Sequence, residues 1–68
     1  MRIHFDTSEF VASHGREPRG RGGWAFDFAG HRGGQVEWAP GSMIFSQARQ
    51  WATARARVLG VDCVAVCS

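Results

Sequence analysis

Hydrophobic and polar residues alternate most clearly in the middle of the chain. Over residues 23–29 every second side chain is a large aromatic one, while Asp27 falls on the opposite side. This period of two is typical of a β-strand with one buried face. Residues 35–39 alternate in the same way, and the glycine-rich stretch 30–34 separates the two segments. The pattern therefore predicts a β-hairpin. Its apolar positions are Trp24, Phe26, Phe28, Val36 and Trp38.

After Pro40-Gly41 the period changes to that of a helix. Ser42 can cap a helix through its hydroxyl, and the helical pattern runs from there to Leu59. Gly60 follows, and glycine suits the left-handed conformation that ends many helices. One stripe of this helix holds small and apolar residues, so it is predicted to face the core. That stripe consists of Phe45, Ala48, Ala52, Ala56 and Leu59.

Two further strands are expected toward the ends of the chain. Residues 2–13 contain two short apolar stretches, which we interpret as one strand, most securely at 9–13. Residues 61–67 are rich in valine and form the last strand, and the segment 14–23, rich in glycine and arginine, is a loop. The predicted order is β-β-β-α-β. The predicted fold is a single α+β domain over 1–68, in which one helix packs on one face of a small antiparallel sheet.

Size and charge limit what such a domain can do. A chain of 68 residues, 44% of them hydrophobic, buries one small core and leaves no room for an enclosed active-site cavity. All eight basic residues are arginine, and six acidic residues leave a net charge of +2. Exclusive use of arginine reflects either a GC-rich coding sequence or a surface that binds through planar guanidinium groups. The small net charge excludes an acidic mimic of nucleic acid and supports strong nonspecific DNA binding only weakly.

The two cysteines indicate a reducing compartment. Cys63 and Cys67 are four residues apart in the last predicted strand, where their α-carbons would be roughly 13 Å apart, beyond the reach of a disulfide. We expect both to be free thiols packed as small hydrophobic residues. No apolar run is long enough to span a bilayer, no signal peptide is evident, and Ala65 stands where a prenylation motif needs cysteine. The protein is therefore expected in the cytoplasm, without a membrane association.

A second apolar stripe on the helix has two interpretations. Ile44, Trp51 and Val58 lie beside the core-facing stripe, with Arg55 among them. In one interpretation Trp51 covers the edge of the core and the stem of Arg55 lies over it. In the other, Trp51 and Arg55 form a binding hot spot, because tryptophan and arginine dominate the binding energy of many interfaces. The far side of the helix is polar. It holds Arg49, Gln50, Thr53 and Arg57.

The arginines of the loop 14–23 are the second candidate site. Arg16, Arg19 and Arg21 lie among glycines, and backbone amides together with guanidinium groups can grip phosphates. The triplets 21–23 and 32–34 also look like fragments of RGG-type nucleic-acid segments. A solvated loop explains the same residues. If the loop is ordered, Arg16 and Arg19 could instead face an acidic protein surface.

Catalysis and metal binding are not expected. The three histidines are spread over a strand and two loops, and no nucleophile with a base can be placed together. His4 and Asp6 share one face of a strand, but two ligands do not make a metal site. The thiols lack a CxxC spacing, and a chain without lysine has no phosphate-binding Walker motif. We therefore expect a protein that is not an enzyme, needs no cofactor and acts by binding a partner.

The stretch SHGREPRGRGGWAF at 13–26, followed by the helical sequence ARQWA at 48–52, resembles very small proteins of phages and prophages. Size and the plan of strands, helix and strand also resemble the compact α+β anti-CRISPR proteins that block type I CRISPR-Cas complexes. The resemblance covers most of the chain. It implies a stoichiometric inhibitor that docks on a host protein or ribonucleoprotein complex in the host cytoplasm, but it carries over no functional residues. The residues predicted to bind the partner are Trp51, Arg55, Arg16, Arg19 and Arg21.

The alternative function is a small nucleic-acid-binding module. In it the arginine loops track phosphates and exposed aromatic side chains stack on bases. Salt dependence separates the two hypotheses, because a binder dominated by phosphate contacts loses affinity steeply as salt rises. The sequence leaves open the partner, the oligomeric state and the face of the sheet that is free.

Overall fold

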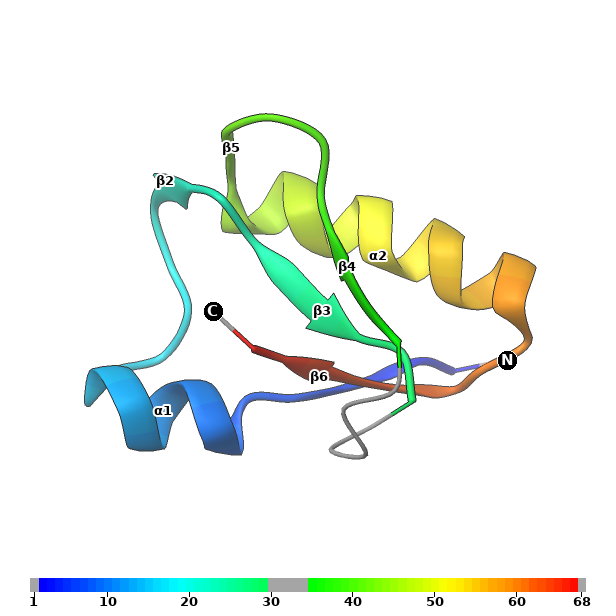
Figure 1. The fold of residues 1–68 in the computed structure, drawn as a ribbon, viewed down its shortest axis with the longest axis horizontal. Coiled ribbons are helices and arrows are strands. Elements are labelled where there is room, and N and C mark those ends of the chain that lie inside the picture. The colour runs from blue at the N-terminus through cyan, green and yellow to red at the C-terminus, as the bar shows by residue number, and fades with distance from the viewer. Residues whose placement is uncertain (1, 30–34, 68) are drawn as a thin grey trace.

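The computed structural model describes residues 2–29 and 35–67 and contains two helices and six short strands (Figure 1). The strands are β1 (His4–Asp6), β2 (Arg21–Gly22), β3 (Ala25–Asp27), β4 (Val36–Trp38), β5 (Met43–Ile44) and β6 (Cys63–Val66). The helices are α1 (Ser8–His14) and α2 (Phe45–Leu59). The predicted α+β class is confirmed. The order β-β-β-α-β is not, because a second helix, α1, and the short strands β2 and β5 are present.

Four strands form one sheet in the order β1-β6-β3-β4, and β2 and β5 form a separate antiparallel pair. Strands β3 and β4 pair antiparallel, as the predicted hairpin requires, while its predicted turn at 30–34 lies outside the described residues. β6 runs antiparallel to β3 but parallel to β1. The prediction of a purely antiparallel sheet is therefore wrong. The sheet is mixed because β1 pairs with the last strand rather than with its neighbour in the chain.

The register of these pairs decides which side chains share a face. Residues directly opposite one another on paired strands point to the same side of a sheet. Phe5 lies opposite Val64, and Phe26 lies opposite both Val66 and Glu37. These five side chains therefore point to one face, which helix α2 covers. The predicted common face of Trp24, Phe26 and Phe28 is confirmed, since all three are buried in one core cluster.

Helix α2 packs closely on the sheet because its inner side chains are small. Ala48, Ala52 and Ala56 are fully buried, each with 0% of its surface exposed, so the predicted alanine stripe is confirmed. The aromatic ring of Phe45 fills the space at the start of the helix, with its centroid 4.8 Å from that of Trp24. Burial of apolar surface of this kind contributes roughly 25 cal/mol per Å². The core thus consists of alanines facing large aromatic and valine side chains.

The start of α2 differs from the prediction, whereas its end agrees. Ser42 does not cap the helix, which begins at Phe45 without a side-chain cap, because residues 43–44 are extended and pair with β2. The backbone N–H of Phe45 donates to the carbonyl of Gly20 at 3.0 Å and so satisfies one donor of the first turn. At the other end Gly60 has φ of 74°, the left-handed conformation predicted for it.

The prediction of a strand at residues 9–13 is wrong, because these residues form helix α1. A carboxylate oxygen of Asp6 accepts the N–H of Ser8 at 2.9 Å, and Gly15, with φ of 71°, ends the helix. Only Phe10 of this helix is buried. Its ring lies 5.6 Å from that of Trp24, and α1 contacts β6 below the strands in the view of Figure 1. The apolar triplet at residues 10–12 has no period of two, and such a short run does not distinguish a strand from a short helix.

Both cysteines are free thiols, as predicted, but they are not packed alike. Cys63 is exposed, so the prediction of two buried thiols is wrong for it. It lies at the start of β6 opposite His4, on the face away from α2. Cys67 is half-buried. Burial, together with the negative charges of Asp27 and Glu9, raises the pKa of its thiol.

Candidate protein-binding site

Trp51 and Arg55, the predicted hot spot, lie where α2 meets the sheet. The indole of Trp51 is half-buried, and its centroid is 6.2 Å from that of Phe26 and 6.2 Å from that of Phe28. Arg55 pairs with Glu37 on β4. Trp51 therefore covers the edge of the core, as in the first of the two interpretations, whereas Arg55 is held by Glu37, a partner that neither interpretation named. Their use in partner binding stays a prediction.

The pair of Arg55 and Glu37 is bidentate. Nε of Arg55 donates to Oε1 of Glu37 at 2.8 Å, and Nη2 donates to Oε2 at 3.2 Å. The hydrogen bond from Arg55 lowers the pKa of Glu37, and the same contact raises the pKa of Arg55. Solvent screens the pair, because 39% of the Arg55 side chain and 26% of the Glu37 side chain are exposed. The pair uses two of the five guanidinium N–H donors of Arg55, so Glu37 fixes the orientation of the donors that remain.

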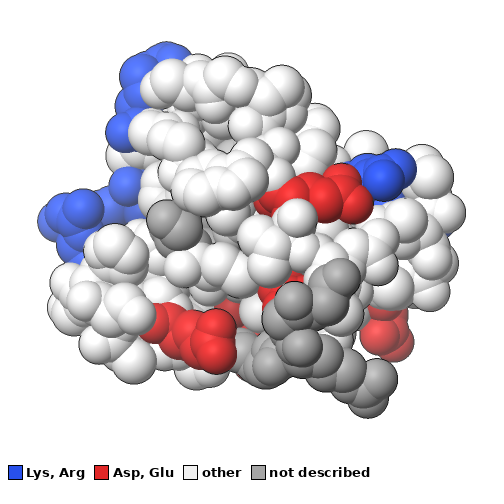
Figure 2. All heavy atoms as spheres, viewed as in Figure 1, with Lys and Arg blue, Asp and Glu red and all other residues white. Residues whose placement is uncertain are grey.

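The three arginines of the predicted loop lie together along one connection. Arg16 and Arg19 are exposed between α1 and β2, and Arg21 belongs to β2. Nη1 of Arg21 donates to the backbone oxygen of Ser42 at 3.4 Å, a long contact that leaves the guanidinium exposed. Figure 2 shows basic side chains at the left margin of the molecule, near this connection and beside uncharged surface. The three arginines thus offer positive charge at one place.

Trp38 stands on the open side of the sheet. It belongs to β4, an edge strand, and 60% of its surface is exposed. It lies opposite Ala25, so it points to the face away from α2. Its ring covers Gly23, where an added Cβ would lie 3.5 Å from the nearest ring atom. Val36 shares this face and is 47% exposed. We call Val36, Trp38 and Gly23 the Trp38 surface.

The Trp38 surface adjoins the arginine connection. Gly23 follows Arg21 by two residues, so the indole that covers Gly23 lies beside the end of the chain segment that carries the arginines. An aromatic anchor with positive charge at its border is a common composition for the centre of a protein interface. Among the described residues, Trp38 is the one large aromatic side chain that is exposed.

Neither a metal site nor a membrane-spanning helix is found among the described residues. Within residues 2–29 and 35–67 no group of three or more His, Cys, Asp or Glu side chains is placed to hold a metal ion. His4 and Asp6 lie on one strand, but a carboxylate oxygen of Asp6 accepts the Ser8 N–H. Neither α1 nor α2 has the length and apolar character that crossing a bilayer requires.

Sequence reasoning did not select Trp38 and Val36 as site residues. The alternation of 35–39 resembles that of 23–29 and predicts the strand, but it does not fix which residues lie opposite one another. The register places Glu37, not Trp38, on the face that α2 covers. In the sequence, the only hint of this register is that Glu37 in the strand could pair with an arginine of the helix. No family model, curated protein or solved structure matches this chain.

Proposed function

We propose that this protein is a non-catalytic binding protein that docks on another protein through the Trp38 surface, with Arg16, Arg19 and Arg21 at its border. The observation that carries the proposal is the 60% exposure of Trp38 on the edge strand β4. The resemblance to phage proteins selects the partner to test first, a host defence complex of the type I CRISPR-Cas class. In this proposal the protein inhibits the complex by covering a part of its surface.

Energetic reasoning supports a protein partner. A tryptophan exposed on an edge strand costs solubility, and an open edge invites pairing with other chains. Burying such a side chain in a pocket of a partner is worth on the order of 2 kcal/mol or more at a hot spot. β4 has only three residues, so it offers little backbone for strand pairing. The side chain of Trp38 must therefore supply most of the binding energy.

The arginines define the chemistry of the partner. Arg16 and Arg19 are exposed, and exposed guanidinium groups at the rim of an interface steer association with a negatively charged surface. The partner should offer an apolar pocket for the indole and carboxylates around it. Such a surface belongs to a protein subunit. A single-stranded nucleic acid would instead stack a base on the exposed indole and place phosphates on the arginines, and salt dependence separates the two.

A plaque assay tests the proposal in cells. Bacteria that carry an active type I CRISPR-Cas system against a phage are made to express the wild-type protein or the variant Trp38→Ala. The wild type should restore plaque formation, and Trp38→Ala should lose at least about 90% of this effect while its melting temperature changes little, since a loss of 2 kcal/mol weakens binding roughly thirtyfold. Val58→Ala is the matched control, because Val58 is 76% exposed and belongs to α2.

Equal activity of wild type and Trp38→Ala would place the binding surface elsewhere. A wild type without effect on plaque formation would remove the defence complex as partner. Binding to a single-stranded oligonucleotide measures the alternative function. Binding that persists at physiological salt and depends on Arg16 and Arg19 would favour a nucleic-acid module over the proposal.

A further inference from the structure

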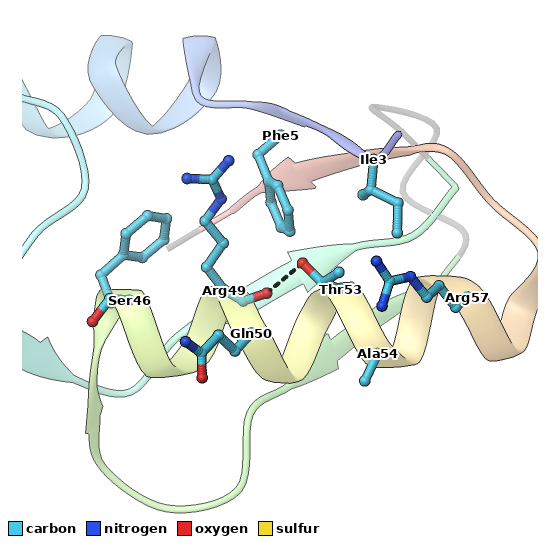
Figure 3. A pocket seen from close by; sticks show the side chains of 9 residues that line it. Ile3, Phe5, Ser46, Arg49, Gln50, Thr53, Ala54 and Arg57 are labelled. Carbon is cyan, nitrogen blue, oxygen red and sulfur yellow. Dashed lines mark hydrogen bonds between the residues drawn. The ribbon is translucent and has the colours of Figure 1, made fainter. Parts of the chain in front are cut away.

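A groove runs between α2 and the edge strand β1, on the opposite edge of the sheet from Trp38 (Figure 3). It encloses about 670 Å³. Its floor is apolar and consists of Ile3, Phe5 and Phe45; the polar side chains of Ser46, Gln50 and Thr53 come from the helix. Figure 3 shows that α2 runs along β1 with Arg49 beside Phe5 and Arg57 beside Ile3. The groove therefore follows the strand.

Two arginines give this groove a positive rim. The guanidinium of Arg49 lies over the ring of Phe5, 5.1 Å from its centroid, and Arg57 is exposed in the last turn of the helix. None of the lining residues is acidic. Within the described residues neither arginine forms an ion pair with a carboxylate. A ligand that carries negative charge on an apolar body would complement both the rim and the floor.

The backbone of β1 supplies a second kind of contact. The N–H of His4 donates to the carbonyl of Asp62 at 2.7 Å, toward β6. Because the backbone groups of successive strand residues point to alternate sides, those of Ile3 and Phe5 point away from β6, to the open edge. Ile3 and Phe5 also line the groove. A polypeptide placed along this edge can thus pair with β1 and reach the groove at once.

The other face of the same strand is hollowed too. A second depression of about 570 Å³ is lined by residues of β1 and α1, including Asp6 and Val11, and by Glu17 of the connection that follows α1. Both depressions include Phe5. Space on both faces of an edge strand is what an added strand needs, because its side chains alternate between the two faces. The presence of Asp6 and Glu17 makes this second face unfavourable for acidic side chains.

The spacing of the arginines fixes the pattern of the ligand. Arg49 and Arg57 are eight residues apart on one helix, which is about 12 Å at 1.5 Å per residue. In an extended peptide, residues i and i+4 are about 13 Å apart and point to the same face. Residue i+2 then lies between them, over the apolar floor.

We propose that β1 accepts an extended acidic peptide segment of a partner protein as an added strand, with carboxylates at positions i and i+4 on Arg49 and Arg57 and an apolar side chain at i+2 over the floor between Phe5 and Ile3. Side chains at i+1 and i+3 point to the other face of β1, where Asp6 and Glu17 favour uncharged residues. This site does not depend on the Trp38 surface, because β1 and β4 are opposite edges of the sheet. The protein can therefore hold two surfaces of one partner, or two partners.

The direct test uses a fluorescein-labelled peptide whose core is Glu-Thr-Val-Thr-Glu, flanked by threonines, and fluorescence anisotropy. It should bind the wild type saturably. A peptide of the same composition with Glu-Val-Thr-Glu as its core puts the two carboxylates on opposite faces and should bind at least about tenfold more weakly. N-methylation of the backbone amides that face β1 should abolish binding, since it removes the strand hydrogen bonds.

Variants locate the peptide on the groove. Arg57→Glu should weaken binding at least about tenfold, and Gln47→Glu, at an exposed position of α2 that does not line the groove, should leave it within about twofold. Arg57→Gln replaces Arg57→Glu if the latter lowers the melting temperature. Addition of the peptide should shift the amide signals of Ile3 and Phe5 in NMR spectra. The signals of residues around Trp38 should not shift.

Three results would overturn the proposal. The first is the absence of saturable binding at millimolar peptide. The second is equal binding of the two spacings or of the N-methylated peptide. The third is an oligonucleotide that displaces the peptide and binds more tightly, in a manner that depends on Arg49 and Arg57, because the groove would then be a nucleic-acid site. The plaque assay with Trp38→Ala is unaffected by any of these, so the two sites fail or succeed separately.

Discussion

The three tryptophans occupy three different environments, although Trp24 and Trp38 stand in similar alternating patterns. Trp24 is buried and its Nε1 donates to the carbonyl of Met43 at 3.0 Å. Trp51 is half-buried against the sheet, and Trp38 is exposed. The alternation of the sequence predicts that 24 and 38 lie in strands, but burial depends on register, and a shift of one residue exchanges the faces. Which tryptophan is free for binding therefore could not be predicted from the sequence.

The partner of the charged residue Arg55 also could not be predicted from the sequence. The sequence places it among apolar residues of the helix, and the structure adds the carboxylate of Glu37, which comes from β4. Arg55→Glu would set one carboxylate against another, and so would disturb the fold as well as any interface. A variant at Trp38 separates binding from stability, because that side chain is exposed.

At the residue scale we predict that Glu37 gives the protein part of its acid sensitivity. Its pKa is lowered from 4.5 by the hydrogen bond from Arg55. A carboxyl group with a lowered pKa in the folded state stabilises it above the unfolded pKa, and this contribution is lost as pH falls through the folded pKa. Glu37→Gln should therefore lower the melting temperature at pH 7 and have a smaller effect below pH 4.5. Thermal unfolding followed by circular dichroism at several pH values measures this.

The partner variant provides the control. Arg55→Gln should reproduce the effect of Glu37→Gln, and the double variant should add little, because both changes remove one interaction. Additive effects, or a Glu37→Gln difference that grows on acidification, would contradict the assignment.

At the scale of elements, the sequence predicts best the segments that bury a regular face. The alanine stripe of α2 and the aromatic face around β3 follow directly from periodicity. Helix α1 was missed because it has seven residues and buries only Phe10, so its apolar triplet looks like a strand. The two-residue strands β2 and β5 have no periodicity at all. Their pairing depends on a tertiary contact between residues 21–22 and 43–44.

The packing of α2 leads to a second prediction. Ala52 is fully buried against the sheet, and Ala54, two residues on, is exposed. Ala52→Leu should destabilise the protein by about 1–3 kcal/mol, since the larger side chain forces the helix away from the core. Ala54→Leu is the matched control and should change stability by less than about 0.5 kcal/mol. Urea unfolding measures both, and equal effects would mean that the helix does not sit close to the sheet.

For the whole molecule, the central position of β6 is the feature that the sequence did not predict. The last strand inserts between β1 and β3, and it pairs parallel with one and antiparallel with the other. No local pattern encodes such a long-range choice. The groove between β1 and α2 exists only because β1 takes this place at the edge. Arg49 and Arg57 therefore looked like an ordinary polar face of a helix in the sequence.

This architecture predicts an uneven stability across the molecule. β6 has neighbours on both sides and three fully buried residues, Val64, Ala65 and Val66, whereas α1 buries one side chain. The amides of β6 should exchange with deuterium only through global unfolding, and those of α1 through local opening, at least about tenfold faster. Native-state hydrogen exchange by NMR measures these rates. Equal protection of α1 and β6 would mean that the domain opens as one unit.

The place of β6 also has a consequence during synthesis of the protein on the ribosome. β1, β3, β4 and α2 all leave the ribosome before residues 63–66, yet β1 and β3 have no common partner until those residues arrive. Until they arrive, β1 has no partner and β3 has one open edge, its other edge being paired with β4, so the four-stranded sheet cannot close before residues 63–66 are made. A chaperone has its opportunity to bind in that interval. If translation stops before residue 63, the released chain lacks β6, cannot complete the sheet and should be degraded by proteases.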